Sequence, residues 1–101
     1  MSEAFTDGQQ IARRCYVSGR VQGVNYRASA RRRALAAGIT GYARNLADGR
    51  VEVFACGPAQ AVQAFIEWLW VGPSAAAVAS VTVEELEIEG SAACPGEFST
   101  G

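Results

Sequence analysis

Hydrophobic residues in the first part of the chain recur first with a period of two and then with a helical period. Residues 13–18 alternate between two faces, which predicts a first strand. Residues 25–37 predict a helix, because four residues fall on one stripe at helical spacing: Tyr26, Ala30, Ala34 and Ala37. The arginines at 31–33 are expected on its outer faces and towards its C-terminal end, where the helix dipole favours cations. Gly38 is expected to end this helix.

The pattern then predicts a hairpin and a second helix. Residues 39–44 and 50–56 favour strands, and the Asp-Gly pair at 48–49 is a strong turn signal between them. The second helix is expected to start at Gly57-Pro58 and to end at Gly72-Pro73. Its apolar stripe consists of Ala61, Val62, Phe65, Ile66 and Leu69.

The remaining segments are less strongly patterned. Val81 and Val83 alternate, and Leu86 and Ile88 continue in the opposite phase, which predicts a bulge or bend in a last strand. Residues 90–101 are expected to form a weakly specified tail with one more short pairing segment near Phe98. Residues 1–10 are polar and patternless, and we expect a flexible extension there.

The order of these elements defines the expected fold class. Strand, helix, strand, strand, helix, strand is the split βαβ arrangement (βαββαβ) of ferredoxin-like folds. We therefore expect an α+β fold in which an antiparallel sheet carries both helices on one face. A chain of 101 residues favours a single domain, here residues 11–101 after the extension at 1–10.

Composition excludes several kinds of chemistry. The chain has no histidine, and all nine basic residues are arginines. Histidine catalysis, lysine Schiff bases and a lysine-dependent phosphate loop are therefore excluded, whereas arginine suits bidentate phosphate recognition. The net charge of −1 argues against nonspecific binding to nucleic acid or membranes, which needs a basic surface.

The three cysteines, Cys15, Cys56 and Cys94, are odd in number and show no C-x-x-C spacing. This usage indicates unpaired cysteines in a reducing compartment. A zinc site is not expected from scattered thiols without histidine. The first residues lack the basic and apolar regions of a signal peptide, and no apolar run approaches the ~20 residues of a membrane span. We therefore expect a cytoplasmic protein.

The segment from Gly19 to Arg27 is a candidate anion-binding site. A strand ends, a loop with glycines at 19 and 23 turns, and a helix begins. The N–H groups of such a loop can point into one concavity, and the helix N-terminus adds partial positive charge. Both glycines permit a positive φ and the close approach of an anion. The alternative is that Gly19 and Gly23 only connect a strand to a helix, since the loop matches neither a Walker loop nor the dinucleotide fingerprint.

Two longer motifs connect this loop with a known family. Residues 19–27 resemble the acylphosphatase signature G-x-V-Q-G-V-x-[FY]-R, and residues 38–49 resemble the second signature of that family, an aromatic residue, an asparagine and then Asp-Gly. The resemblance extends over residues 13–88.

This resemblance implies hydrolysis of a small-molecule acyl phosphate to a carboxylate and inorganic phosphate. By position, Arg27 is the arginine that binds phosphate, and Asn45 holds the attacking water. The backbone amides that form the phosphate cradle are those of Arg20, Val21, Gln22, Gly23 and Val24. We expect no cofactor, no metal and no nucleic-acid or membrane partner, and we expect a monomer. An acyl phosphate has a good leaving group, so positioning and charge stabilisation suffice for its hydrolysis.

Some features depart from the family or favour other functions. Leu46 stands where a small hydroxyl residue is common, and the C-terminal end is shorter and more polar than usual. An RNA-recognition module shares this element order, and Tyr16 and Phe54 could stack bases on an open sheet face. Glu52 and the acidic last strand argue against that function. A catalytically silent module that senses phosphate is a further alternative.

Overall fold

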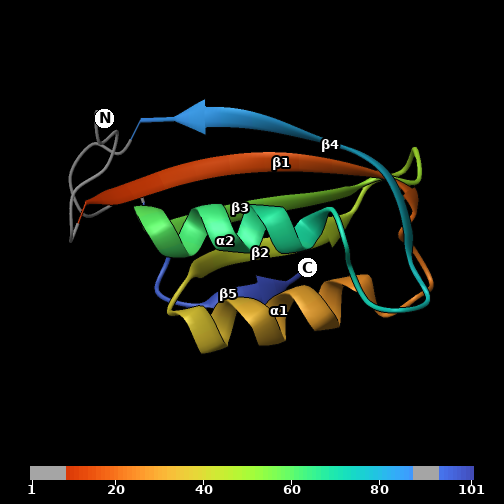
Figure 1. The fold of residues 1–101 in the computed structure, drawn as a ribbon, viewed down its shortest axis with the longest axis horizontal. Coiled ribbons are helices and arrows are strands. Elements are labelled where there is room, and N and C mark those ends of the chain that lie inside the picture. Colours follow the sequence, from red (N-terminus) through yellow and green to blue (C-terminus); the bar gives the residue numbers. More distant parts are fainter. Residues whose placement is uncertain (1–8, 88–93) are drawn as a thin grey trace.

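The computed structural model describes residues 9–87 and 94–101 and contains seven elements over these residues. In chain order they are β1 (Gln10–Arg20), α1 (Tyr26–Ala37), β2 (Thr40–Asn45), β3 (Val51–Pro58), α2 (Ala59–Leu69), β4 (Ala77–Leu86) and β5 (Phe98–Thr100). The strands form one sheet in the order β4-β1-β3-β2-β5. Both helices cover the same face of this sheet (Figure 1), which confirms the ferredoxin-like α+β prediction. Most of the predicted extension lies outside the described residues.

Strand β1 is longer than the predicted segment 13–18. It pairs antiparallel with β3 from Gln10 to Val17 and with β4 from Ala12 to Arg20. Because two neighbouring strands extend along it, residues without local alternation are still held in the sheet. The predicted hairpin is confirmed, since β2 and β3 pair antiparallel.

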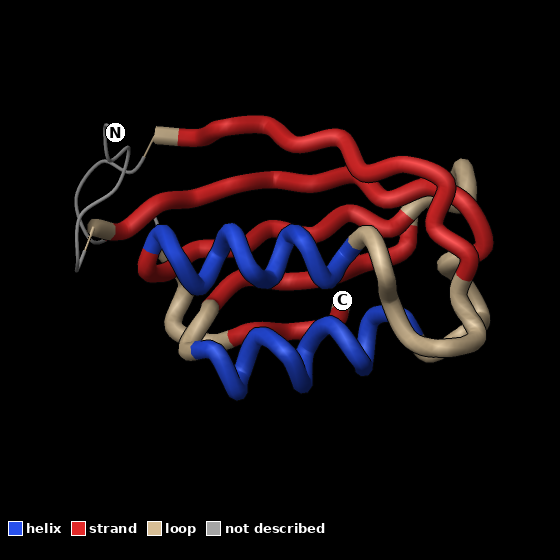
Figure 2. The backbone as a smooth tube through the Cα atoms, in the orientation of Figure 1, coloured by secondary structure: helices blue, strands red, loops and turns tan. Residues whose placement is uncertain are grey.

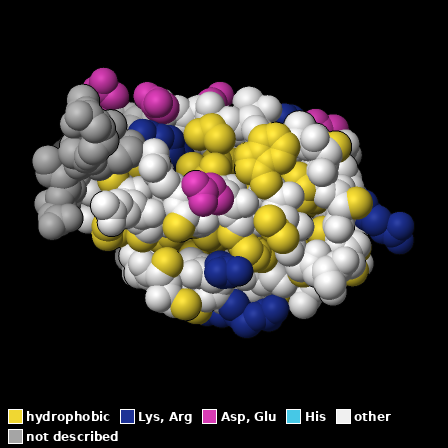
Figure 3. All heavy atoms as spheres, in the orientation of Figure 1, with side chains coloured by type: hydrophobic (Ala, Val, Ile, Leu, Met, Phe, Trp, Pro, Cys, Tyr) yellow, Lys and Arg dark blue, Asp and Glu magenta, His cyan; other side chains and the backbone are white. Residues whose placement is uncertain are grey.

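Helix α1 begins one residue later than predicted, with Asn25 as its N-cap, and its buried face differs in part. Its buried positions include Tyr26, Ala30 and Ala34, as predicted, but Ala37 is exposed and Ser29 is buried instead. The arginines at 31–33 are exposed, and Figure 3 shows basic side chains over the part of the surface where α1 runs. The predicted stabilisation of the helix dipole by these arginines is wrong, because no basic residue lies in the last turn of α1.

Glycine ends α1 as predicted, whereas α2 ends earlier than predicted. Gly38 has a left-handed φ of 75°, and its N–H donates to backbone carbonyls of the last turn. Helix α2 ends at Leu69 rather than at Gly72-Pro73. A side chain at Gly72 would lie 2.8 Å from the ring of Tyr26, so this glycine allows α1 and the α2–β4 loop to pack closely.

The C-terminal strand β5 changes the character of the sheet. Phe98 is 1 % exposed and packs edge-to-face on Phe65 of α2, with ring centroids 5.9 Å apart. This burial confirms a pairing segment near Phe98. However, β5 runs parallel to β2, so the sheet is mixed rather than antiparallel. Figure 2 shows this short C-terminal strand next to helix α1.

The predicted irregularity in β4 lies at another place. The pairing of β1 and β4 is continuous from Ala12 to Ser18, and the register shifts between Ser18 and Gly19. Leu86 does face away from Val83, as the phase change indicated, but no bulge lies between them. Ile88 lies outside the described residues.

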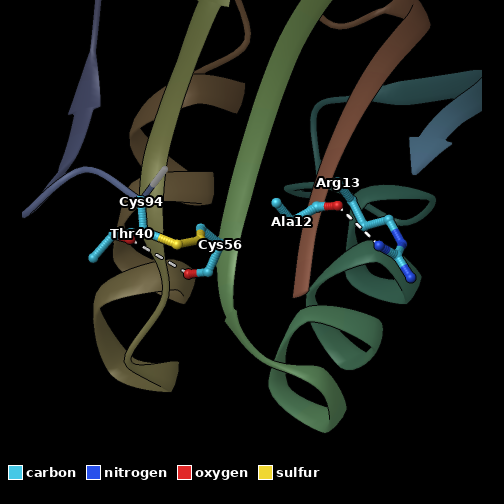
Figure 4. The surroundings of a disulfide bond; sticks show 5 residues. All are labelled: Ala12, Arg13, Thr40, Cys56 and Cys94. Atoms are coloured by element: carbon cyan, nitrogen blue, oxygen red, sulfur yellow. Dashed lines mark hydrogen bonds between the residues drawn. A yellow bond between two sulfur atoms is a disulfide. The ribbon is translucent and has the colours of Figure 1, made fainter. Parts of the chain in front are cut away.

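The expectation of unpaired cysteines is wrong for two of the three. Cys56 in β3 and Cys94 form a disulfide (Figure 4), whereas Cys15 is free and buried. Burial raises the pKa of the Cys15 thiol to about 12. Cys56 and Cys94 are 38 residues apart in the sequence, and they meet because the chain returns towards β2. No local pattern in the sequence reveals this return. Within the described residues, no helix is long and apolar enough to cross a membrane.

Candidate active site

The ends of three strands meet at one edge of the sheet. β3 is antiparallel to both β1 and β2, so β1 and β2 run in the same direction, and β5 runs parallel to β2. Their carboxyl ends therefore lie at the same edge, next to the start of α1. An open pocket of about 260 Å³ lies there. It is lined by Val21, Gly23, Asn25, Tyr26, Arg27, Ala28, Asn45 and Thr100. The fold thus brings Arg27 and Asn45, the two predicted catalytic residues, to one pocket.

The loop between β1 and α1 has a left-handed backbone where it borders the pocket. Gly23 has a φ of 77° and Asn25 a φ of 66°. A Cβ atom added at Gly23 would meet no other atom within 4 Å, so the backbone there is open to a ligand. Gly19 differs, because an added Cβ would lie 2.3 Å from the carbonyl oxygen of Ala77. The close approach at Gly19 is therefore by β4 and not by an anion.

The N-terminus of α1 also points at the pocket. Asn25 is the N-cap, and its side chain makes no capping hydrogen bond. Its carbonyl accepts the first helical bond from the N–H of Ser29 at 3.1 Å. The amides of Tyr26, Arg27 and Ala28 precede this bond and have no acceptor within the helix. They line the pocket, and no acidic residue lies in the first turn. The helix thus places unneutralised partial positive charge beside the pocket.

The side chains of Arg27 and Asn45 are both accessible to a ligand. Arg27 is half-buried, and its Nη1 donates to the carbonyl oxygen of Gly101 at 3.4 Å. Asn45 is the last residue of β2 and is exposed. Among the described residues, no hydrogen bond of its side-chain amide is found. This amide is therefore free to bind water.

Three of the predicted phosphate-binding residues do not line the pocket. Arg20 is the exposed last residue of β1, beside Ala77 of β4. Val24 packs against the hydrophobic core. The side chain of Gln22 extends to the β2–β3 turn. The predicted contact of these three residues with a phosphate is through their backbone amides, and it stays a prediction.

The buried wall of the pocket was not anticipated from the sequence. The hydroxyl of Tyr26 donates to the carbonyl oxygen of Leu69 at 2.5 Å, which fixes α1 against the end of α2. Burial raises the pKa of Tyr26, so its hydroxyl stays protonated. Thr100 comes from the segment that looked weakly specified. The burial of Phe98 two residues earlier is what holds it at the pocket, and this aromatic residue was the available signal.

The aromatic residues of the open sheet face contact neighbouring side chains. The guanidinium carbon of Arg50 lies 4.8 Å from the ring centroid of Tyr16, and Phe54 stacks on Tyr42 at 5.6 Å. Glu52 of β3 is a buried carboxylate that accepts a hydrogen bond from the hydroxyl of Tyr42. The two rings considered for base stacking are therefore partly covered by the protein itself. No group of three or more Cys, Asp or Glu residues within 9–87 and 94–101 could hold a metal ion.

Comparison with known proteins identifies close relatives. The sequence profile of the family described as Acylphosphatase matches residues 13–99. An acylphosphatase of Halorhodospira halophila is 54 % identical over 88 residues, which are 87 % of this chain and 91 % of that protein. One from Chromohalobacter salexigens is 51 % identical over 88 residues, 87 % of this chain and 93 % of that protein. The solved acylphosphatase structure from Coxiella burnetii is similar, with a TM-score of 0.83, 38 % identity and coverage of 91 % and 93 % of the two chains.

Proposed function

Because the chain belongs to the acylphosphatase family and is an enzyme that hydrolyses acyl phosphates, we propose that the pocket between β1, α1 and β2 is its active site. The observation that carries the proposal is that Arg27, Asn45 and the open backbone at Gly23 border the same pocket. These groups supply what the reaction requires, namely an anion site and a polar group for water.

The phosphate end of the substrate binds at the loop and the start of α1. Backbone amides of residues 20–24 and the first amides of α1 donate hydrogen bonds to the phosphate oxygens. The guanidinium of Arg27 adds a permanent positive charge and two parallel N–H donors. The transition state spreads negative charge over the three equatorial oxygens of the phosphoryl group. Donors placed to match those oxygens in the transition state lower the barrier as well as bind the substrate.

Asn45 orients the attacking water. Its amide has an acceptor oxygen and a donor group, so it can hold a water molecule in one orientation without acting as a strong base. The water oxygen bonds to phosphorus as the bond from phosphorus to the carboxyl oxygen breaks. The carboxylate leaves with the electron pair, and the water proton passes to a phosphate oxygen. No strong general base is required, because the carboxylate is a good leaving group.

Two substitutions test the roles separately. Arg27→Ala and Asn45→Ala should each lower kcat for benzoyl phosphate by about 10²–10³ while the protein stays folded. Arg27→Ala should also weaken inhibition by inorganic phosphate, whereas Asn45→Ala should leave that inhibition nearly unchanged. Arg32→Ala is a matched control, because this exposed arginine of α1 contacts Ser29 and not the pocket. Near-wild-type turnover by either variant would refute the role of that residue.

We also propose a cytoplasmic, monomeric enzyme that uses no cofactor or metal and binds no nucleic acid. In a reducing cytoplasm Cys56 and Cys94 would be free thiols, and their disulfide would form on oxidation. The supporting observations are the absence of a membrane-spanning helix among the described residues, the net charge of −1 and the arginine-based pocket. Cell fractionation, a sedimentation experiment, turnover in the presence of a chelator and a salt-dependent RNA titration test these four properties in that order. Loss of turnover with chelator, a stable dimer or salt-sensitive RNA binding would contradict the corresponding property.

A further inference from the structure

The side chain of Gln22 joins two parts of the active site that are far apart in sequence. Gln22 lies between Val21 and Gly23, which both line the pocket. Its own side chain is half-buried and extends away from them. Its Nε2 donates to the carbonyl oxygens of Leu46 and Arg50, both at 2.9 Å. The phosphate loop is therefore bonded directly to the β2–β3 turn.

The two carbonyls that Gln22 contacts mark the two ends of that turn. The N–H of Leu46 donates to the carbonyl oxygen of Arg50 at 2.8 Å, and the N–H of Gly49 donates to that of Leu46 at 3.1 Å. A glutamine amide has two N–H donors, and here each has its own acceptor. Gln22 thus satisfies both ends of the turn at once, at the position directly after Asn45.

Other contacts of the turn are local to it. Asp48 accepts hydrogen bonds from the backbone N–H and the Nε of Arg50 at 3.1 and 2.8 Å. These bonds shape the turn but do not place it relative to the phosphate loop. Within residues 9–87 and 94–101, the two bonds of Gln22 are the hydrogen bonds found between the β1–α1 loop and the turn. The sheet holds Asn45 at β3, which in turn pairs with β1, and the side chain of Gln22 adds the direct link between the loop and the turn.

We propose that Gln22 is a positioning residue for acyl phosphate hydrolysis, which holds the amide of Asn45 at the correct distance from the bound phosphate. It acts through the main chain of Leu46 and does not touch the substrate with its side chain. This inference rests on the proposed role of Asn45 in holding water. Displacement of a reacting group by about 1 Å can cost about 10² in rate, so a short hydrogen-bonded link of this kind has a large effect on turnover.

Gln22→Met is the first test, because methionine has a similar length and no N–H donor. We expect kcat for benzoyl phosphate to fall by about 10–100-fold. The inhibition constant of inorganic phosphate should change less than about twofold, because the cradle and Arg27 remain. Gln60→Met is the matched control, since Gln60 is exposed on α2 and does not line the pocket. It should leave both constants unchanged.

A double-mutant cycle separates positioning from a general loss of structure. In the background of Asn45→Ala, Gln22→Met should lower kcat no further, because the residue through which it acts is gone. If Gln22→Met does not fold, the shorter Gln22→Asn replaces it in the same cycle, as it removes the link but keeps a polar side chain.

The outcomes distinguish this inference from the proposed function. If Asn45→Ala is impaired but Gln22→Met keeps wild-type kcat, only the role of Gln22 is overturned. Additive losses in the cycle, or weaker phosphate inhibition in Gln22→Met comparable to that in Arg27→Ala, overturn it as well. Wild-type kcat in Asn45→Ala overturns both proposals.

Discussion

Replacing Glu52 with glutamine should destabilise the protein in a pH-dependent way. Glu52 lies on β3 and is 4 % exposed. Its carboxylate accepts hydrogen bonds from Nε of Arg44 at 2.8 Å and from the hydroxyl of Tyr42 at 2.9 Å. Glutamine has nearly the same shape, so the substitution removes the charge and one acceptor without leaving a cavity.

The size of the effect follows from burial and from the two bonds. Hydrogen bonds to a charged group contribute about 1.5–3 kcal/mol each when desolvated. The Arg44 side chain is 54 % exposed, so its bond must be discounted for solvent screening. Glutamine also keeps one oxygen acceptor. We therefore expect Glu52→Gln to lower the free energy of unfolding by about 1–3 kcal/mol near neutral pH.

The pH dependence has a definite sign. Burial alone raises the pKa of the Glu52 carboxyl, but the hydrogen bonds from Arg44 and Tyr42 and the positive charges of Arg44 and Arg14 outweigh it. The folded-state pKa thus lies below the ordinary value of 4.5. A depressed pKa stabilises the folded state above 4.5, and this stabilisation is lost as the pH falls through the folded-state pKa. The difference between wild type and Glu52→Gln should therefore shrink in acid.

Urea unfolding of both proteins at neutral pH and at several pH values below 4.5 measures this difference. Glu84→Gln is the control, because Glu84 pairs with Arg14 at 3.0 Å while both side chains are partly exposed. That pair should contribute about 0–1 kcal/mol. A difference between wild type and Glu52→Gln that stays constant with pH would refute the reasoning. An equal loss of stability in Glu84→Gln would refute it too.

Three further predictions concern the scaffold of the site. Gly19→Ala should lower the free energy of unfolding by about 2–4 kcal/mol, because the new Cβ atom would lie 2.3 Å from the carbonyl oxygen of Ala77. An unchanged melting temperature would contradict this. Phe98→Ala should lower the free energy of unfolding, measured with urea, by about 3–5 kcal/mol. A loss below about 1 kcal/mol would show that the core does not need β5. Cys94→Ser should lower the free energy of unfolding by about 4 kcal/mol, because the disulfide to Cys56, 38 residues away, restricts the unfolded chain. A thiol reductant should destabilise the oxidised wild type but not the variant.

The predicted elements agree with the structure where the local pattern is strong. The stripe of α1 and the Asp-Gly turn depend on neighbouring residues only. The turn is confirmed, and so is the stripe except at Ala37, which is exposed. The ends of β1, the parallel β5 and the site of the bulge were not predicted correctly. Their positions depend on pairing with strands distant in sequence, which hydrophobic periodicity does not record.

The candidate site shows the same division. Arg27 and Asn45 were found because each lies within a motif of neighbouring residues. The direction of the Gln22 side chain was not predicted, since the two carbonyl oxygens that it contacts lie 24 and 28 residues away in the sequence. Thr100 was missed because a short strand at the sheet edge has little pattern of its own.

The amino-acid sequence by itself determined the chemistry available to this protein: arginine as the only basic residue, no histidine, and glycines where the backbone must turn. It also determined the order of helices and strands. The tertiary structure decided which of these parts meet. Because β1, β2 and β5 run in the same direction, their carboxyl ends come together at the start of α1. Only this arrangement brings Arg27 and Asn45 to one pocket, and only it lets Gln22 bond the loop to the turn.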